Sequence, residues 1–253
     1  MCQPRRKSAK TLPYISNASI PSLYVIFTLT ILLTFTVNHF LPLHDSTFVP
    51  GLGFSGFWYT FGRINSLSAS EYASGEYYCF SAGCLAVSAR FLNKDVQEVA
   101  RTALDAQGRW RSGNLTRYEV ATDFVDTLLS RDEGDEEGGD EWLEKVKVIT
   151  TSWYGLMPVV TQAKTREELK GLLIKTSFIP FATGFGLAAE DGEMDGGFSM
   201  LFHPRCKKAI YLPVRWDMFK NILNVNMGME TVERLYAKGL EDGRVRRDSE
   251  AKV

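Results

Sequence analysis

The most informative segment of the chain reads Tyr77-Tyr78-Cys79-Phe80-Ser81-Ala82-Gly83-Cys84-Leu85. An aromatic, strand-like run stops at Ser81, and a helix of small residues follows. In enzymes with the pattern G-x-S-x-G, such a turn lifts a nucleophilic serine clear of the backbone and directs the next helix at the developing oxyanion. Gly83 is the small residue needed where strand and helix cross, and Cys79 occupies the first glycine position. The simpler interpretation is an ordinary helix N-cap at Ser81.

A glycine-rich segment lies upstream, Phe48-Val49-Pro50-Gly51-Leu52-Gly53-Phe54-Ser55-Gly56-Phe57-Trp58-Tyr59. A glycine loop between a strand and a helix exposes several backbone N–H groups in one direction, which suits a phosphate or an oxyanion. Its glycines also fit the dinucleotide-binding pattern G-x-G-x-x-G. That interpretation ranks second, because Glu71 and Glu76 precede the next strand and no acidic residue ends it. An ordinary tight turn is the third interpretation.

A third segment, Asp191-Gly192-Glu193-Met194-Asp195-Gly196-Gly197-Phe198-Ser199, places a carboxylate in a glycine turn. Asp-Gly pairs commonly form turns, so a turn cap is the plain interpretation of Asp195. The order of a glycine loop, a serine turn and a late Asp-Gly-Gly favours a catalytic interpretation.

Together these segments resemble the patatin-like phospholipase family, specifically its adipose-triglyceride-lipase and adiponutrin branch. The resemblance extends from about Phe48 to Gly243. The glycine loop is similar to that branch's oxyanion loop and first helix. Two further stretches are similar to the family's helix and Ser-x-x-Pro turn before the aspartate, namely Thr165-Arg166-Glu167-Glu168-Leu169 and Ser177-Phe178-Ile179-Pro180. The chain departs from the family pattern at Cys79, Leu52 and Ser55.

The resemblance implies an α/β protein with a three-layer α/β/α fold and a mainly parallel central sheet. It implies a catalytic dyad of Ser81 and Asp195, with no metal or cofactor, and an oxyanion hole from Gly51, Gly53 and the amide of Ala82. Four glycines would support these motifs, namely Gly56, Gly83, Gly196 and Gly197. The expected activity is hydrolysis of carboxylic esters in triacylglycerol or phospholipid, at a membrane or lipid-droplet surface.

In the expected reaction, Ser81 attacks the ester carbonyl while Asp195 takes its proton, and water then releases the acyl group. A Ser-Asp-His arrangement through His203 is a weaker alternative, and His203 itself is expected in a loop or at the surface. Two other functions stay open. One is a non-catalytic or weakly active lipid-binding protein, and the other is an acyltransferase that uses the same dyad.

The composition agrees with a single hydrolase domain. The 253 residues are 45% hydrophobic and 12% aromatic, which is enough for one sizeable core. A net charge of −1 argues against a nucleic-acid partner, because such partners usually require a basic surplus. The cysteines, which are Cys2, Cys79, Cys84 and Cys206, show no metal-binding spacing. Cys79 and Cys84 are expected to be buried thiols.

The N-terminus predicts a membrane anchor. A basic tail over 1–18 contains Arg5, Arg6, Lys7 and Lys10, and the uncharged apolar run over 19–43 is long enough to cross a bilayer. The main alternative is a cleaved signal peptide, followed by an organellar targeting sequence.

The topology of this anchor has two readings. The positive-inside rule would keep the tail cytosolic and send the rest of the chain across the membrane, whereas many relatives act on the cytosolic side. We expect a single-pass protein of the endoplasmic reticulum or of the lipid-droplet surface. Sequons begin at Asn17 and Asn114, and they are glycosylation sites only if they face a lumen.

Strand and helix patterns alternate over 44–253, the predicted acyl hydrolase domain, which indicates a parallel sheet covered on both faces. Strands are expected at Thr47–Val49, Glu76–Phe80, Lys145–Trp153 and Ala209–Val214. Helices are expected from the glycine loop to Tyr72, over 82–93, 95–106, 117–130 and 165–177, and as two C-terminal helices. The acidic stretch 131–141 does not match a calcium-binding loop and predicts a flexible, solvated loop.

Overall fold

The computed structural model describes residues 42–130, 139–184, 186–189, 191–210 and 227–250. The predicted basic tail and most of the predicted anchor lie outside these residues. The anchor's expected last residue, Leu43, already begins the first strand. Among the helices that are described, none is both long and apolar enough to cross a membrane.

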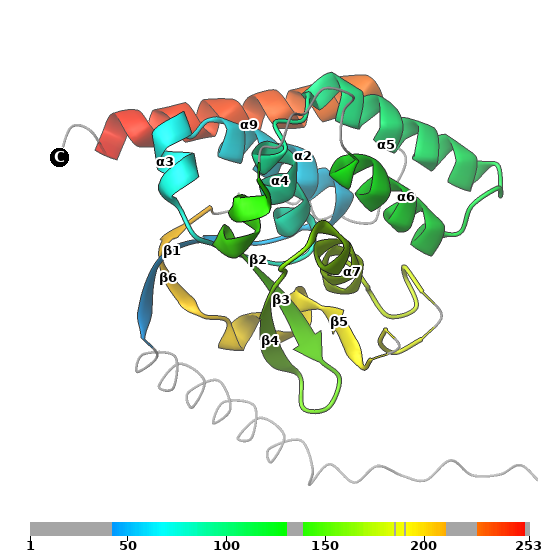
Figure 1. The fold of residues 1–253 in the computed structure, drawn as a ribbon. Coiled ribbons are helices and arrows are strands. Elements are labelled where there is room, and N and C mark those ends of the chain that lie inside the picture. The colour runs from blue at the N-terminus through cyan, green and yellow to red at the C-terminus, as the bar shows by residue number, and fades with distance from the viewer. Residues whose placement is uncertain (1–41, 131–138, 185, 190, 211–226, 251–253) are drawn as a thin grey trace, which may run out of the picture. The chain divides into compact units, whose positions relative to one another are not determined.

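The described part of the chain forms a mixed α/β structure around a mostly parallel six-stranded sheet, which confirms the predicted fold class at that level (Figure 1). The strands are β1 (Leu43–Val49), β2 (Tyr77–Cys79), β3 (Val146–Ser152), β4 (Met157–Gln162), β5 (Glu193–Asp195) and β6 (Arg205–Ala209). Their order is β4-β3-β2-β1-β6, and β5 also pairs with β3. The β1–β2, β1–β6 and β2–β3 pairs are parallel, whereas β4 and β5 are antiparallel to β3.

Strand β3 has two different neighbours along the same edge. Its first half pairs with β2, where Cys79 lies opposite Val148. Its second half pairs with β5, where Asp195 lies opposite Thr150. Strand β5 therefore continues the sheet where β2 ends, and Asp195 comes level with the residues that follow Cys79.

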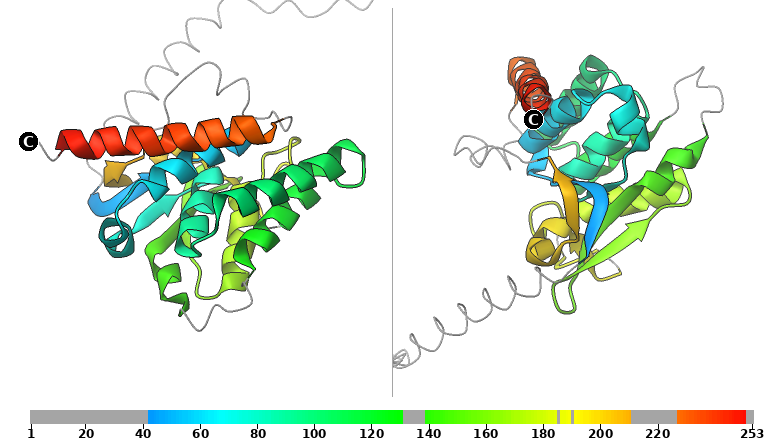
Figure 2. Two further views of the ribbon diagram at one scale, coloured as in Figure 1. Left: turned by 90° about the horizontal axis from the view of Figure 1, so that it is seen from above. Right: turned by 90° about the vertical axis from the view of Figure 1, so that its left-hand side faces the viewer.

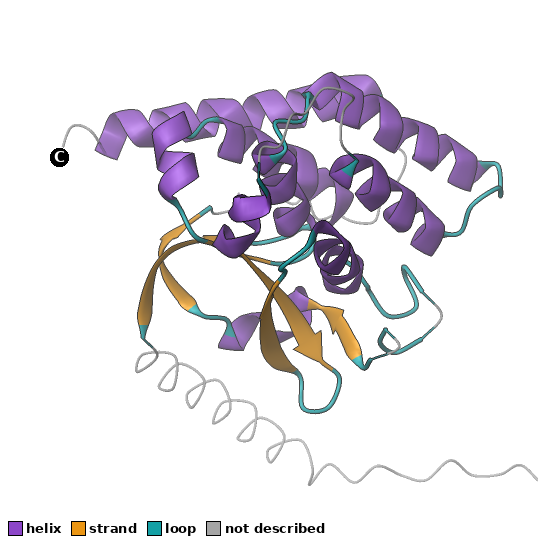
Figure 3. Cartoon of the chain, in the orientation of Figure 1, coloured by secondary structure: helices purple, strands orange, loops and turns teal. Residues whose placement is uncertain are grey.

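The helices follow the strands in sequence. They are α2 (Gly53–Asn65), α3 (Ala69–Ser74), α4 (Ala82–Phe91), α5 (Val96–Arg111), α6 (Arg117–Leu129), α7 (Arg166–Thr176) and α9 (Met229–Glu250). Two 3₁₀ segments, η2 and η3, span Asp140–Lys145 and Gly196–Phe202. Figure 3 shows most helices above the strands.

Apolar side chains cover both faces of the sheet, because successive strand residues point to opposite sides. Val49 and Cys79 belong to the large core that the helices enclose. Phe48, Tyr78 and Phe80 belong to a smaller cluster on the other face, beside η3.

Helices α2 and α9 cross at two glycines, and Figure 2 shows α9 lying along this layer. A Cβ atom added at Gly62 would lie 2.1 Å from the carbonyl oxygen of Tyr236. One added at Gly239 would lie 2.1 Å from the carbonyl oxygen of Tyr59. The contact is therefore backbone against backbone. Nearby, the Tyr59 hydroxyl donates to the Asp242 carboxylate at 2.9 Å.

Several predicted boundaries were wrong. The helix expected to reach Tyr72 ends at Asn65, because a capping box formed by Ser68 and Glu71 starts a new helix. Strands β4 and β5 were not predicted. The strand expected at Ala209–Val214 lies earlier, ending at Ala209, and residues 211–214 are outside the described part.

Two further expectations need correction or stay open. The acidic loop was expected to reach residue 141, but Asp140 begins η2 and its carboxylate accepts a bond of 2.7 Å from Arg166. Residues 131–138 lie outside the described part. Of the two C-terminal helices expected, the described residues contain α9.

The glycine crossing gives a stability prediction. Gly239→Ala should lower the free energy of unfolding by about 1–3 kcal/mol, because the new methyl group overlaps the Tyr59 carbonyl and forces α9 away from α2. The measurement is urea unfolding followed by circular dichroism. Gly108→Ala is the matched control, since a Cβ there meets no atom within 4 Å. It should raise stability by about 0.5–1 kcal/mol. Equal stability of Gly239→Ala and the parent would contradict the close crossing.

Candidate functional site

Ser81 occupies a sharp turn between β2 and α4, as the sequence predicts. Its backbone has φ 50° and ψ −137°, a region that residues with a side chain rarely adopt. Its N–H donates to the Thr176 hydroxyl at 2.9 Å, and that hydroxyl donates to the Ile149 carbonyl at 2.6 Å. Thr176 is fully buried. The strained turn is therefore tied to both α7 and β3.

The glycine loop lies directly against this turn. A Cβ atom added at Gly51 would lie 2.5 Å from the Cβ of Ser81 and 2.7 Å from the nitrogen of Ala82. One added at Gly83 would lie 2.3 Å from the Val49 carbonyl oxygen. Both positions require glycine because the loop after β1 and the start of α4 meet backbone to backbone.

Gly53 and Ala82 are the first residues of α2 and α4, so their N–H groups have no partner inside those helices. Gly53 also has φ 58°, which favours glycine. Gly51 and Ala82 therefore lie beside Ser81, and Gly53 lines the same cavity as Ser81. The predicted motif glycine Gly56 lies in α2, where a Cβ would meet the Leu52 side chain at 2.6 Å.

Asp195 lies beside the Ser81 turn because it belongs to β5, which pairs with the part of β3 beyond the end of β2. Its carboxylate accepts hydrogen bonds from the Ser81 side chain and from the Gly197 N–H, the latter at 2.7 Å. The predicted pair is therefore in contact. Gly196 is needed here, since a Cβ would lie 2.4 Å from the Ile149 carbonyl oxygen.

Both members of the pair are almost inaccessible, with Ser81 7% and Asp195 6% exposed. Burial raises the pKa of Asp195 from 3.8 to about 6, and the hydrogen bonds from Ser81 and Gly197 oppose this rise. The carboxylate is consequently ionised at neutral pH and able to take a proton as the solution approaches its pKa. General bases are often carboxyl groups whose pKa is raised toward neutral pH by burial.

His203 was expected in a loop or at the surface, and the surface part was wrong. It is 6% exposed and lies between the rings of Phe48 and Phe80, with centroids 5.5 and 5.1 Å away. Its Nε2 donates to the Gly196 carbonyl at 2.8 Å, and burial lowers its pKa to about 4. The Asp195 carboxylate is bonded to Ser81 and Gly197, so the described contacts favour the pair over a triad through His203.

Cys79 and Cys84 were expected to be buried thiols. They are fully buried, but they form a disulfide, with their Cα atoms 5.0 Å apart. The bond joins the last residue of β2 to the first turn of α4 and encloses Ser81. Cys79, at the first glycine position of the G-x-S-x-G pattern, therefore forms a covalent bond with the helix that follows Ser81.

An apolar cavity of about 170 Å³ adjoins Ser81. Ser81 and Ala82 form part of its wall, and the remaining lining is mostly apolar, including Phe57, Leu85, Val120, Ala121, Phe124 and Ile179. Arg117 lies at this cavity, held over the Trp110 ring and donating to the Ala182 carbonyl at 3.1 Å. Within the described residues, no cluster of three or more His, Cys, Asp or Glu side chains is arranged to bind a metal ion.

Sequence reasoning missed Thr176, which fixes the Ser81 turn. The only local signal was its position as the last residue of α7, one residue before the Ser-x-x-Pro stretch. A threonine there reads as an ordinary helix end. Its role depends on the strand that α7 contacts, which the sequence does not give.

Comparisons of the chain with protein-family models, with curated protein sequences and with solved structures find no significant match. The resemblance to patatin-like phospholipases therefore stays a prediction from the residues, and the contacts around Ser81 carry the functional argument.

Thr176 gives the first test of this site. Thr176→Val should lower the free energy of unfolding by about 1–3 kcal/mol, because the Ser81 N–H and the Ile149 carbonyl lose their buried partner. Thr176→Ser keeps the hydroxyl and should retain most of the stability. Urea unfolding of both variants makes the comparison. If valine and serine gave equal stability, the hydroxyl would not support the turn.

Asp195 gives a pH-dependent stability prediction. Its folded-state pKa is raised, so the folded protein binds the proton more tightly, and stability falls as the pH rises from about 4 to about 6. Asp195→Asn removes this charge while its side-chain oxygen can still accept from Gly197. The variant should therefore become more stable than the parent over that interval and keep a constant advantage above it. Urea unfolding across the interval provides the measurement, and a pH-independent difference would contradict the assigned burial of the charge.

Proposed function

We propose that this protein is a serine lipid acyl hydrolase that cleaves carboxylic esters of triacylglycerol or phospholipid. The observation that carries the proposal is the hydrogen bond from the Ser81 side chain to the buried Asp195 carboxylate, at the wall of an apolar cavity. The strained turn at Ser81 and the glycine loop against it support the same conclusion. We also propose that the helices and the central sheet form the three-layer α/β/α arrangement of the patatin-like fold.

The proposed chemistry has two steps. Ser81 Oγ attacks the ester carbonyl carbon while Asp195 accepts its proton, and the alcohol part of the lipid leaves with that proton. The N–H groups of Gly51, Gly53 and Ala82 stabilise the negative oxygen of the tetrahedral intermediate. A water molecule then gives a proton to Asp195, attacks the acyl ester, and restores the Ser81 hydroxyl.

The cavity supports an acyl chain as the bound group. Its wall is built from aliphatic and aromatic side chains of α2, α4 and α6, so it offers an alkyl chain contacts that water cannot match. Ser81 is one of the residues that line this cavity, so an ester whose acyl chain fills the cavity would bring its carbonyl close to Ser81. An ester of a long-chain fatty acid therefore suits the site better than a polar ester.

Membrane association belongs to the same proposal. The uncharged apolar run that precedes β1 would hold the domain that follows it at a bilayer as a single-pass anchor. A lipid ester is then present at high local concentration beside the enzyme. The proposed partners are the lipid substrate and the membrane surface that contains it.

Covalent labelling tests the proposed nucleophile. A fluorophosphonate probe should label the parent protein at a rate that rises with pH through about 6, because only the ionised Asp195 can accept the Ser81 proton. Ser81→Ala should abolish labelling, and Asp195→Asn should reduce it by roughly 100-fold or more, the usual contribution of a general base.

Ser88→Ala is the matched control for this experiment, because Ser88 is a buried serine of the same helix α4 and lies outside the proposed dyad. It should be labelled like the parent. A folded parent that takes up no probe would reject the hydrolase proposal and leave lipid binding without catalysis. Labelling that survives Ser81→Ala would place the reactive group elsewhere.

A further inference from the structure

The loop between α5 and α6 carries a sequon that is well placed for modification. Asn114-Leu115-Thr116 follows the last turn of α5, and Asn114 is exposed. The neighbouring Gly113 faces open space, since a Cβ added there meets no atom within 4 Å. Figure 1 shows this loop projecting at the far end of the two helices.

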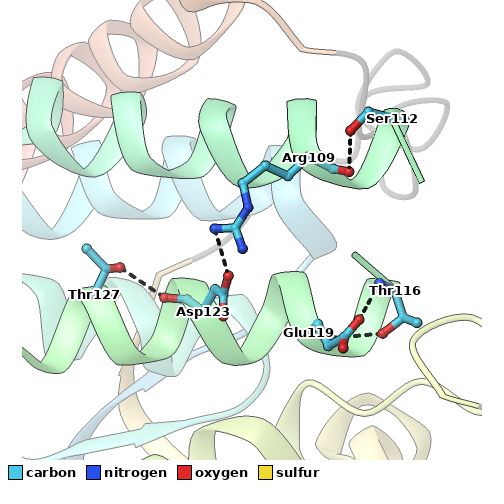
Figure 4. A network of polar contacts seen from close by, with 6 residues as sticks. All are labelled: Arg109, Ser112, Thr116, Glu119, Asp123 and Thr127. Atoms are coloured by element: carbon cyan, nitrogen blue, oxygen red, sulfur yellow. Dashed lines mark hydrogen bonds and ion pairs between the residues drawn. The ribbon is translucent and has the colours of Figure 1, made fainter. Parts of the chain in front are cut away.

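The two ends of this loop are held firmly, as Figure 4 shows. Arg109 of α5 forms an ion pair of 3.1 Å with Asp123 of α6. Thr116 caps α6 through a capping box with Glu119, accepting from its N–H at 3.2 Å. Among the described residues, the Asn114 side-chain amide donates one exposed hydrogen bond, to the Ser112 hydroxyl at 2.9 Å. A group attached to the Asn114 side chain would therefore displace few existing contacts.

A second, independent observation is the disulfide between Cys79 and Cys84. Disulfides persist in oxidising compartments and are rare in the cytosol. The bond forms when the two thiols lose two electrons and two protons by exchange with a donor disulfide, which becomes a dithiol. The same compartment of the secretory pathway holds the machinery that glycosylates asparagine.

The charge distribution gives a third observation. Arg5, Arg6, Lys7 and Lys10 precede the apolar run, and the next lysine or arginine after Lys10 is Arg63. An excess of basic residues marks the cytosolic side of a membrane segment. The tail would therefore remain cytosolic, and the domain of residues 44–253 would enter the lumen.

We infer that this domain faces the lumen of the secretory pathway and carries an N-linked glycan on Asn114. In the modification, Asn114 Nδ2 forms a bond to the anomeric carbon of a lipid-diphosphate-linked oligosaccharide. The bond from that carbon to the diphosphate oxygen breaks, the lipid diphosphate leaves with the electron pair, and the amide loses a proton. A domain on this side would act on the lumenal leaflet and would have no access to the cytosolic surface of a lipid droplet.

The test is translation of the full chain in the presence of microsomes, with and without a glycan-removing endoglycosidase. The parent should gain the mass of one glycan, which the endoglycosidase removes. Asn114→Gln and Thr116→Asp should both lose this shift. Aspartate caps a helix about as well as threonine, so Thr116→Asp separates loss of the sequon from loss of the fold.

Two matched controls sharpen the test. Thr116→Ser preserves both the sequon and the cap, so it should keep the glycan. Asn17→Gln removes the sequon on the tail side of the apolar run and should change nothing. An unmodified parent, or a shift that Asn114→Gln retains and Asn17→Gln removes, would overturn the inference.

The oxidation state of the cysteines gives a readout that does not depend on the glycan. After the glycosylated chain is unfolded, Cys79 and Cys84 should react with an alkylating reagent only once the disulfide has been reduced. Cys206 should react without prior reduction. Free thiols at Cys79 and Cys84 would contradict a lumenal domain. Ser81→Ala should be glycosylated like the parent, so failure of this inference is distinguishable from failure of the proposed chemistry.

Discussion

The structure depends on the close approach of three backbones around Ser81. A Cβ atom added at Gly51, in the loop after β1, would lie only 2.5 Å from the Cβ of Ser81. Likewise, a Cβ atom added at Gly83, in the first turn of α4, would lie 2.3 Å from the carbonyl oxygen of Val49 at the end of β1. No residue larger than glycine fits at either position, and the strained backbone of Ser81 persists because its surroundings hold it. The Thr176 hydroxyl and the Cys79–Cys84 bond are two such restraints.

The register of β3 is a second constraint, because it determines which residue of β5 lies beside Ser81. Strand β3 pairs first with β2 and then with β5, so its own backbone sets the spacing between Cys79 and Asp195. A shift of one residue in β5 would turn the Asp195 side chain to the opposite face of the sheet. The contact between Ser81 and Asp195 is therefore a property of the sheet, although the two residues are far apart in sequence. Burial of that carboxylate opposes stability at neutral pH and makes it a suitable base.

The sequence predicted the Ser81 turn, the glycine loop and the mostly parallel sheet, because each of these depends on local residue types. It did not predict β4, since Pro158 argues against a strand and is tolerated only because β4 lies at the sheet edge. Strand β5 is three residues long, too short to leave a pattern. The Cys79–Cys84 bond and the burial of His203 depend on how the chain folds back on itself, which residue spacing does not show.

The most direct test of the account is to trap the acyl-enzyme. The purified protein is incubated with triacylglycerol or phospholipid, quenched in acid and digested, and the peptide Ile64–Arg90 is fragmented in a mass spectrometer. We expect this peptide to gain the mass of one fatty acid minus a water, located on Ser81 and missing from Ser81→Ala. Hydrolysis of the lipid with no acyl group on Ser81, or with the group on another residue, would contradict the account.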